Sequence, residues 1–160
     1  MDTKRLRTCC FTGHRQIPPV DRPWLEARLE QTIMELYRRG VIYHGVGGAL
    51  GADTLAAQTV LRLRDQCPGI KLILVLPCLD QTRGWRSEDA EEYERIKSLA
   101  DKVVYTGQQY TRDCMFRRNR YLVDHSGTCI CYMTRNTGGT AYTVSYARQH
   151  GLNIINLAKA

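Results

Sequence analysis

The residues best suited to chemistry begin with a glycine-rich stretch, residues 45–53. It reads Gly-Val-Gly-Gly-Ala-Leu-Gly-Ala-Asp and stands between a short apolar run and a helical pattern. Glycines without a Cβ leave room for a ligand, and the free N–H groups at a helix start attract anions, most often phosphate. We expect the anion cradle to consist of Gly47, Gly48 and Gly51. The spacing is one residue longer than the dinucleotide-binding fingerprint, so a plain strand-to-helix turn is the alternative.

A second glycine turn, made by Gly138, Gly139 and Thr140, opens another helical pattern near the end of the chain. Two such turns in one sheet favour a phosphate cradle more strongly than one. Thr140 either adds a hydroxyl to a phosphate or only caps its helix.

Four further candidates, Thr12, Gly13, His14 and Arg15, directly follow the first expected strand. Arg15 suits a phosphate as a bidentate partner, and a solvated arginine is the alternative. His14 is the best candidate for acid or base chemistry because its reference pKa is ~6.5, although no carboxylate partner for it can be identified. Asp53 stands at a helix start, where it either accepts a ribose hydroxyl or caps the helix.

Arg118 and Asn119 lie in a helical pattern at residues 113–124. Neighbouring helical positions point about 100° apart, so Arg117, Arg118 and Arg120 cannot all face one way, and we expect at least one in solvent. Asn119, an amide beside an apolar stripe, is either a ligand contact or a buried group that ties a loop.

The elements that position these residues alternate along the chain. Expected strands at residues 6–11, 41–46, 70–76, 102–105, 128–132 and 152–157 are separated by helical patterns. This alternation predicts an α/β fold, a single Rossmann-like domain over residues 1–160 with a mostly parallel sheet and helices on both faces. Ligands bind beyond the carboxyl ends of such strands, so the loops at residues 12–15, 45–53 and 137–140 should converge.

Composition excludes several classes of protein. No apolar run approaches the ~20 residues that span a bilayer, and we expect a cytoplasmic protein with no membrane partner. Seven cysteines and four histidines show neither disulfide nor metal-ligand spacing, so we expect reduced, buried cysteines and no metal site. The net charge of +7 is spread along the chain, which permits nucleic acid as a partner without favouring it.

Five ordered motifs together resemble the YpsA-like family of the SLOG superfamily, which also contains the DprA/Smf and LOG proteins. The motifs are residues 10–15, residues 47–53, residues 76–78, Arg118-Asn119 and Gly138-Gly139-Thr140. The resemblance implies a bacterial protein with a Rossmann-like fold and a pocket for a nucleotide derivative such as NAD or ADP-ribose. LOG enzymes carry a catalytic glutamate after their glycine turn, whereas residues 141–145 contain no acid. This departure argues against LOG-type hydrolysis.

The leading hypothesis is therefore a small-ligand binding protein for a nucleotide or nucleotide derivative, acting as a sensor or regulator. One alternative is a hydrolase that cleaves an N-glycosidic or phosphate bond of such a ligand. The other is DprA-like binding of single-stranded nucleic acid, which is favoured by the net charge of +7 and the arginines at residues 117–120. The sequence leaves enzymatic turnover, the cofactor's identity and assembly into a homo-oligomer open.

Overall fold

The computed structural model describes residues 3–158 and contains one six-stranded sheet in which every strand pair is parallel. The strand order is β4-β3-β2-β1-β5-β6. The strands are β1 (Thr8–Gly13), β2 (Tyr43–Val46), β3 (Lys71–Leu76), β4 (Lys102–Tyr105), β5 (Thr128–Tyr132) and β6 (Asn153–Asn156). The helices are α1 (Thr3–Leu6), α2 (Arg22–Arg38), α3 (Ala52–Leu63), α4 (Ser87–Leu99), α5 (Cys114–Asp124) and α6 (Gly139–Gln149). The predicted Rossmann-like α/β fold is confirmed.

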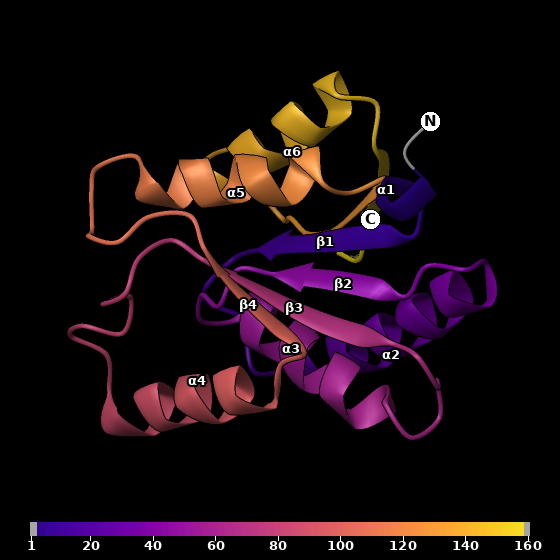
Figure 1. The fold of residues 1–160 in the computed structure, drawn as a ribbon, viewed down its shortest axis with the longest axis horizontal. Helices are drawn as coiled ribbons and strands as arrows, with labels where there is room; N and C mark the ends of the chain where they lie inside the picture. The colour runs from indigo at the N-terminus through magenta and orange to yellow at the C-terminus, as the bar shows by residue number, and fades with distance from the viewer. Residues whose placement is uncertain (1–2, 159–160) are drawn as a thin grey trace.

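Helices cover both faces of the sheet (Figure 1). Helices α2, α3 and α4 lie on one face, and α5 and α6 lie on the other. Two hydrophobic cores correspond to these faces, one containing Leu25 and Val60 and the other containing Leu122 and Ala147. Among the described residues, no helix is long and apolar enough to cross a membrane.

Strand β3 shows why a central parallel strand is an almost continuous apolar run. Its Leu72, Leu74 and Leu76 side chains belong to the core under α2 to α4, whereas Val75 belongs to the core under α5 and α6. Both faces of the strand are covered, so neither set of alternating positions can be polar. All seven cysteines are likewise buried.

The predicted first strand is shifted along the chain. Thr3–Leu6 form the short helix α1, which closes with a hydrogen bond from the Arg7 N–H to the Lys4 carbonyl at 3.0 Å. Strand β1 consequently begins at Thr8 and continues through Gly13, which pairs with Tyr132 of β5. Thr12 and Gly13, expected in a loop, are thus the last residues of a central strand.

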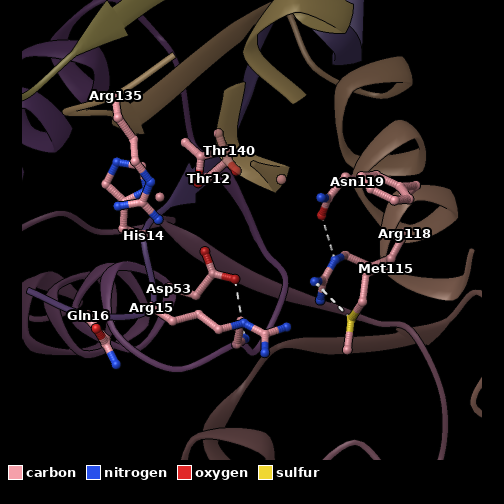
Figure 2. Close-up of a pocket in the computed structure, with 14 residues that line it drawn as sticks. Thr12, His14, Arg15, Gln16, Asp53, Met115, Arg118, Asn119, Arg135 and Thr140 are labelled. Carbon is pink, nitrogen blue, oxygen red and sulfur yellow. Dashed lines mark hydrogen bonds between the residues drawn. The ribbon is translucent and has the colours of Figure 1, made fainter. Parts of the chain in front are cut away.

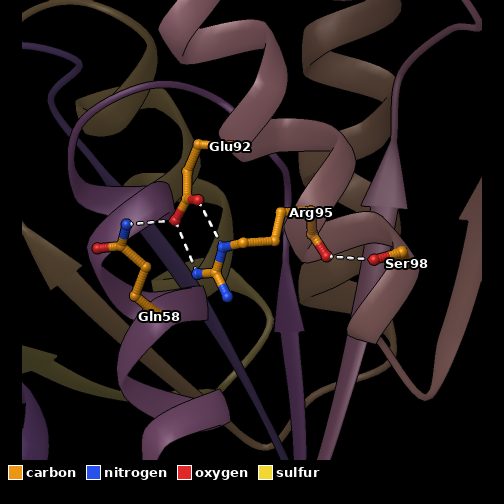
Figure 3. A network of polar contacts seen from close by, with 4 residues as sticks. All are labelled: Gln58, Glu92, Arg95 and Ser98. Carbon is orange, nitrogen blue, oxygen red and sulfur yellow. Dashed lines mark hydrogen bonds and ion pairs between the residues drawn. The ribbon is translucent and has the colours of Figure 1, made fainter.

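A polar network joins α3 to α4 (Figure 3). Gln58 on α3 donates to a carboxylate oxygen of Glu92 at 2.6 Å, and Arg95 donates two bonds to the same carboxylate at 2.6 and 2.8 Å. The hydrogen bonds from Arg95 lower the pKa of Glu92 to about 2. This network holds α4 beside the helix that starts at the glycine-rich loop.

Candidate functional site

The cleft of the molecule lies at the carboxyl ends of β1 and β5, where the strand order changes direction. Strands β2 to β4 extend from one side of β1, and β5 and β6 extend from the other. The connections that leave such a pair of strands cover opposite faces and leave a crevice between them. A cleft of about 360 Å³ is found here, within the range of small-molecule sites.

Most of the residues selected from the sequence line this cleft. They are Thr12, Gly13, His14, Arg15, Asp53, Arg118, Asn119, Gly139 and Thr140. The first and the last of their four segments are more than 100 residues apart in the chain, and the parallel sheet brings all four together as expected. Gly47, Gly48, Gly51 and Gly138 do not line the cleft; from the first glycine stretch, Ala49 and Asp53 do so instead.

Close packing accounts for the glycines of the first stretch. A Cβ on Gly47 would lie 2.6 Å from the Arg118 guanidinium, and one on Gly48 would lie 2.6 Å from Leu76. A Cβ on Gly51, where φ is +77°, would overlap the backbone of Arg15 and lie 2.6 Å from the carbonyl oxygen of His14. These glycines let a side chain and a neighbouring loop approach the backbone, and this packing is a sufficient reason for their spacing.

Arg118 is a buried arginine that points toward the cleft (Figure 2). Its Nε donates to the Asn119 side-chain oxygen at 2.7 Å, another nitrogen donates to the Gly47 carbonyl, and a third contacts the Met115 sulfur at 3.5 Å. Only 3% of Arg118 is exposed. All these acceptors are neutral, and within residues 3–158 Arg118 forms no ion pair. Asp53 of the same cleft acts on its charge from a longer distance. A buried guanidinium that forms no ion pair keeps a strong preference for an anion.

Asp53 is the acidic residue of the cleft. It is buried, and it is the second residue of α3, whose N-cap position is occupied by Gly51. Its carboxylate instead accepts a hydrogen bond at 3.2 Å from the N–H of Ala49, in the loop before the helix. Burial raises its pKa to about 6, and the nearby Arg118 and Arg15 reduce this rise. The capping role is therefore wrong, whereas contact with a ribose hydroxyl stays a prediction.

We expect Asp53→Asn to stabilise the protein above pH 6. The folded-state pKa of about 6 exceeds the usual value of 3.8, so between these pH values the folded protein holds a proton that the unfolded chain has lost. Wild-type stability therefore falls as the pH rises from about 4 to about 6, by about 2 to 3 kcal/mol. Asparagine does not titrate and can still accept from Ala49.

Urea unfolding at pH 4.5 and pH 7.5 measures this difference. Asp53→Asn should gain stability over wild type mainly at pH 7.5, and the same substitution at exposed Asp65 controls for the loss of one negative charge. An equal effect of Asp53→Asn at both pH values would contradict a raised pKa.

His14 is held as a neutral ring. Its Nε2 accepts a hydrogen bond from the Thr134 N–H at 2.9 Å, which places its own proton on Nδ1. Burial, aided by the positive charge of Arg135, lowers its pKa. The ring also packs edge-to-face on Tyr132, with centroids 5.7 Å apart. His14 therefore connects β1 to the loop after β5, and its Nε2 is not free to act as a base.

Three arginines give the cleft its charge. Arg15, Arg118 and Arg135 all line it, and Asp53 is the acid among the lining residues. Figure 2 shows Asp53 and Arg15 between the His14 side and the Arg118 side of the cleft. The resulting positive potential suits an anionic ligand.

Sequence reasoning missed five lining residues: Gln16, Ala49, Met115, Phe116 and Arg135. Four of them had a signal in the sequence. Arg135 follows β5 closely, at a carboxyl end, and Ala49 lies inside the glycine-rich stretch. Met115 and Phe116 stand one helical turn before Arg118 and Asn119, and no local pattern indicated Gln16.

Two solved structures are similar in fold to this chain. DNA processing protein A (DprA) of Streptococcus pneumoniae superposes with a TM-score of 0.68 at 19% identity, over 96% of this chain and 50% of that one. DNA processing protein A of Helicobacter pylori, described with a single-stranded DNA binding mode, gives 0.67 at 17% identity, over 95% and 65%. This chain thus spans about half to two thirds of those proteins, and the likeness concerns the fold.

Sequence comparison identifies the family. A UPF0398 protein of Halalkalibacterium halodurans is 30% identical over 129 residues, which is 79% of this chain and 68% of that protein. A UPF0398 protein of Bacillus pumilus is 27% identical, over 79% and 70%, and the prophage-derived protein YoqJ of Bacillus subtilis is 27% identical, over 78% and 81%. The profile of YpsA, described as the YspA SLOG family, matches residues 20–155. The chain therefore belongs to the YpsA family of SLOG proteins.

Proposed function

We propose that this protein binds an anionic nucleotide derivative, such as NAD or ADP-ribose, in the cleft at the ends of β1 and β5. The observation that carries the proposal is the buried guanidinium of Arg118, which lines the cleft and forms no ion pair among the described residues. Arg15 and Arg135 add positive charge at the same place. A diphosphate group carries the negative charge with which these three arginines can pair.

The start of α6 offers the second part of the phosphate site. Gly139 and Thr140 begin this helix and line the cleft, and the preceding Gly138 has φ of +91°. A Cβ on Gly138 or Gly139 would meet nothing within 4 Å, so the backbone there is open to a ligand. The positive end of the helix dipole adds to the attraction for a phosphate. The carboxylate of Asp53 can accept a hydrogen bond from a ribose hydroxyl.

Binding without turnover fits the cleft better than hydrolysis does. The first turn of α6 contains no acidic residue, and the Nε2 of His14 already accepts from Thr134. One observation favours the hydrolase alternative: the pKa of Asp53 lies near 6, where a carboxylic acid can exchange a proton at neutral pH. Chromatography of NAD or ADP-ribose after long incubation with the protein tests this alternative. A product that wild type forms and the Asp53→Asn variant does not form would establish enzymatic turnover.

Single-stranded nucleic acid is a third candidate ligand. It rests on the net charge of +7, on the arginines near the cleft, and on the fold likeness to a DprA described with a single-stranded DNA binding mode. Binding of this kind weakens steeply with salt. A gel shift at low salt that is lost at 200 mM salt would support it, and the absence of any shift at low salt would remove it.

Isothermal titration calorimetry tests the main proposal. Purified protein is titrated with NAD, ADP-ribose, AMP and a cyclic nucleotide, and with adenosine as the uncharged control. We expect heat of binding from at least one phosphate-containing ligand and none from adenosine. The absence of heat from all of them at millimolar concentration would overturn the proposal.

A further inference from the structure

An exposed aromatic pair stands at the α5 side of the cleft. Phe116 on α5 lines the cleft and is 38% exposed, and Tyr142 on α6 is 40% exposed. Their rings meet edge-to-face with centroids 4.6 Å apart and an interplanar angle of 64°. Neither ring belongs to the two hydrophobic cores, so core packing does not explain why these positions are aromatic.

The pair is held in place by its surroundings. Arg120, one helical turn after Phe116, donates a hydrogen bond to the Tyr142 hydroxyl at 3.0 Å. One turn further along both helices, the Tyr146 hydroxyl donates to Asp124 at 2.8 Å. These two contacts fix α6 against α5, and they hold Tyr142 in its edge-to-face contact with Phe116. Phe116 is therefore a positioned, partly exposed ring in the wall of the cleft.

The position of Phe116 relative to the guanidinium of Arg118 indicates how a ligand is oriented in the cleft. Phe116 lies on the same helix as Arg118 and Asn119, which also line the cleft. An exposed aromatic ring within one helical turn of a buried guanidinium suits a ligand that has a flat ring at one end and a negative charge next to it. A sugar phosphate has the charge without the ring.

We propose that Phe116, held by Tyr142, is the platform on which the aromatic base of the ligand stacks, so that the cleft selects nucleotides over sugar phosphates. This inference rests on the proposed function and specifies the ligand class of the same cleft. Stacking of a base on an aromatic side chain changes affinity by about 5- to 150-fold on alanine substitution. Recognition by stacking tolerates different bases, since every base has a π-face.

The test compares AMP with ribose 5-phosphate by calorimetry, using wild type, Phe116→Leu and Phe116→Tyr. Leucine keeps the apolar volume without an aromatic face, and tyrosine keeps the face. We expect wild type to bind AMP at least about 10-fold more tightly than ribose 5-phosphate. Phe116→Leu should weaken AMP binding by about 10-fold and leave ribose 5-phosphate unchanged, whereas Phe116→Tyr should retain the preference.

The outcomes separate this inference from the proposed function. If wild type binds AMP and ribose 5-phosphate equally and Phe116→Leu weakens neither, the stacking platform is overturned and the anion site stands. If wild type binds neither compound nor any nucleotide, the proposed function fails and the platform fails with it. A second readout is the fluorescence of Phe116→Trp, which AMP should quench beyond the wild-type change and ribose 5-phosphate should not; equal quenching by both would also overturn the platform.

Discussion

Replacing Gly51 by alanine is expected to destabilise the protein by about 3 to 5 kcal/mol. Two costs add at this position. The φ of +77° is unfavourable for any residue with a Cβ, and the new methyl group would overlap backbone atoms of His14 and Arg15. Backbone cannot rotate away as a side chain can, and the Ala52 N–H already holds the His14 carbonyl at 3.1 Å. Overpacking against fixed atoms typically costs 1–3 kcal/mol or more.

Gly69→Ala is the matched control. Gly69 has a similar φ of +88°, yet a Cβ there would meet nothing within 4 Å. Only the conformational cost applies, so we expect a loss of about 1 kcal/mol. Urea denaturation of both variants at one pH measures the difference. Equal losses at the two positions would show that the loop of residues 14–15 moves aside without cost, and the packing explanation for Gly51 would be wrong.

The glycine-rich stretch illustrates what the sequence could and could not predict. Its place between a strand and a helix followed from the apolar run of residues 41–46 and the helical pattern after Asp53. Its expected role as an anion cradle rested on the same local pattern. The packing of Arg118 on Gly47 and of His14 and Arg15 on Gly51 joins segments far apart in the chain, which a local pattern does not contain.

The fold itself was predictable because its determinants are local and repeated. Alternation of strand and helix patterns implies a parallel sheet, and the buried run at β3 implies a strand covered on both faces. The rule that ligands meet the carboxyl ends of parallel strands then brought Thr12, His14 and Thr140 to one cleft without any contact being known.

The partners of polar groups were not predictable for the same reason. The bond between the Thr134 N–H and His14 joins residues 120 positions apart, and it turns a candidate base into a structural contact. The carboxylate of Asp53 contacts the loop before its helix instead of the helix end. Strand β1 also begins later than expected because α1 includes Leu6, a short helix with no buried residue and hence no apolar period to reveal it.

Arg118→Met is expected to separate binding from stability. Methionine has a similar length and no charge, and burying a charge that forms no ion pair costs free energy, so removing that charge offsets the lost hydrogen bonds. The Gly47 carbonyl retains a second donor, the Gln81 side chain at 3.4 Å. We therefore expect the free energy of unfolding to change by less than about 1 kcal/mol. Binding of ADP-ribose should nevertheless fall by about 100-fold, because a desolvated charge pair with the phosphate is lost.

The same titration and urea unfolding measure both quantities. Arg112→Met is the matched control, since Arg112 is exposed and absent from the cleft lining; it removes one positive charge from the overall field and should change affinity by less than about 3-fold. Arg118→Lys should recover part of the affinity, because it restores the charge without the planar fork. If Arg118→Met binds ADP-ribose as tightly as wild type, Arg118 does not hold the phosphate. If it instead loses several kcal/mol of stability, the buried guanidinium serves the Gly47 turn, and the anion site must then be sought at Arg15 and the start of α6.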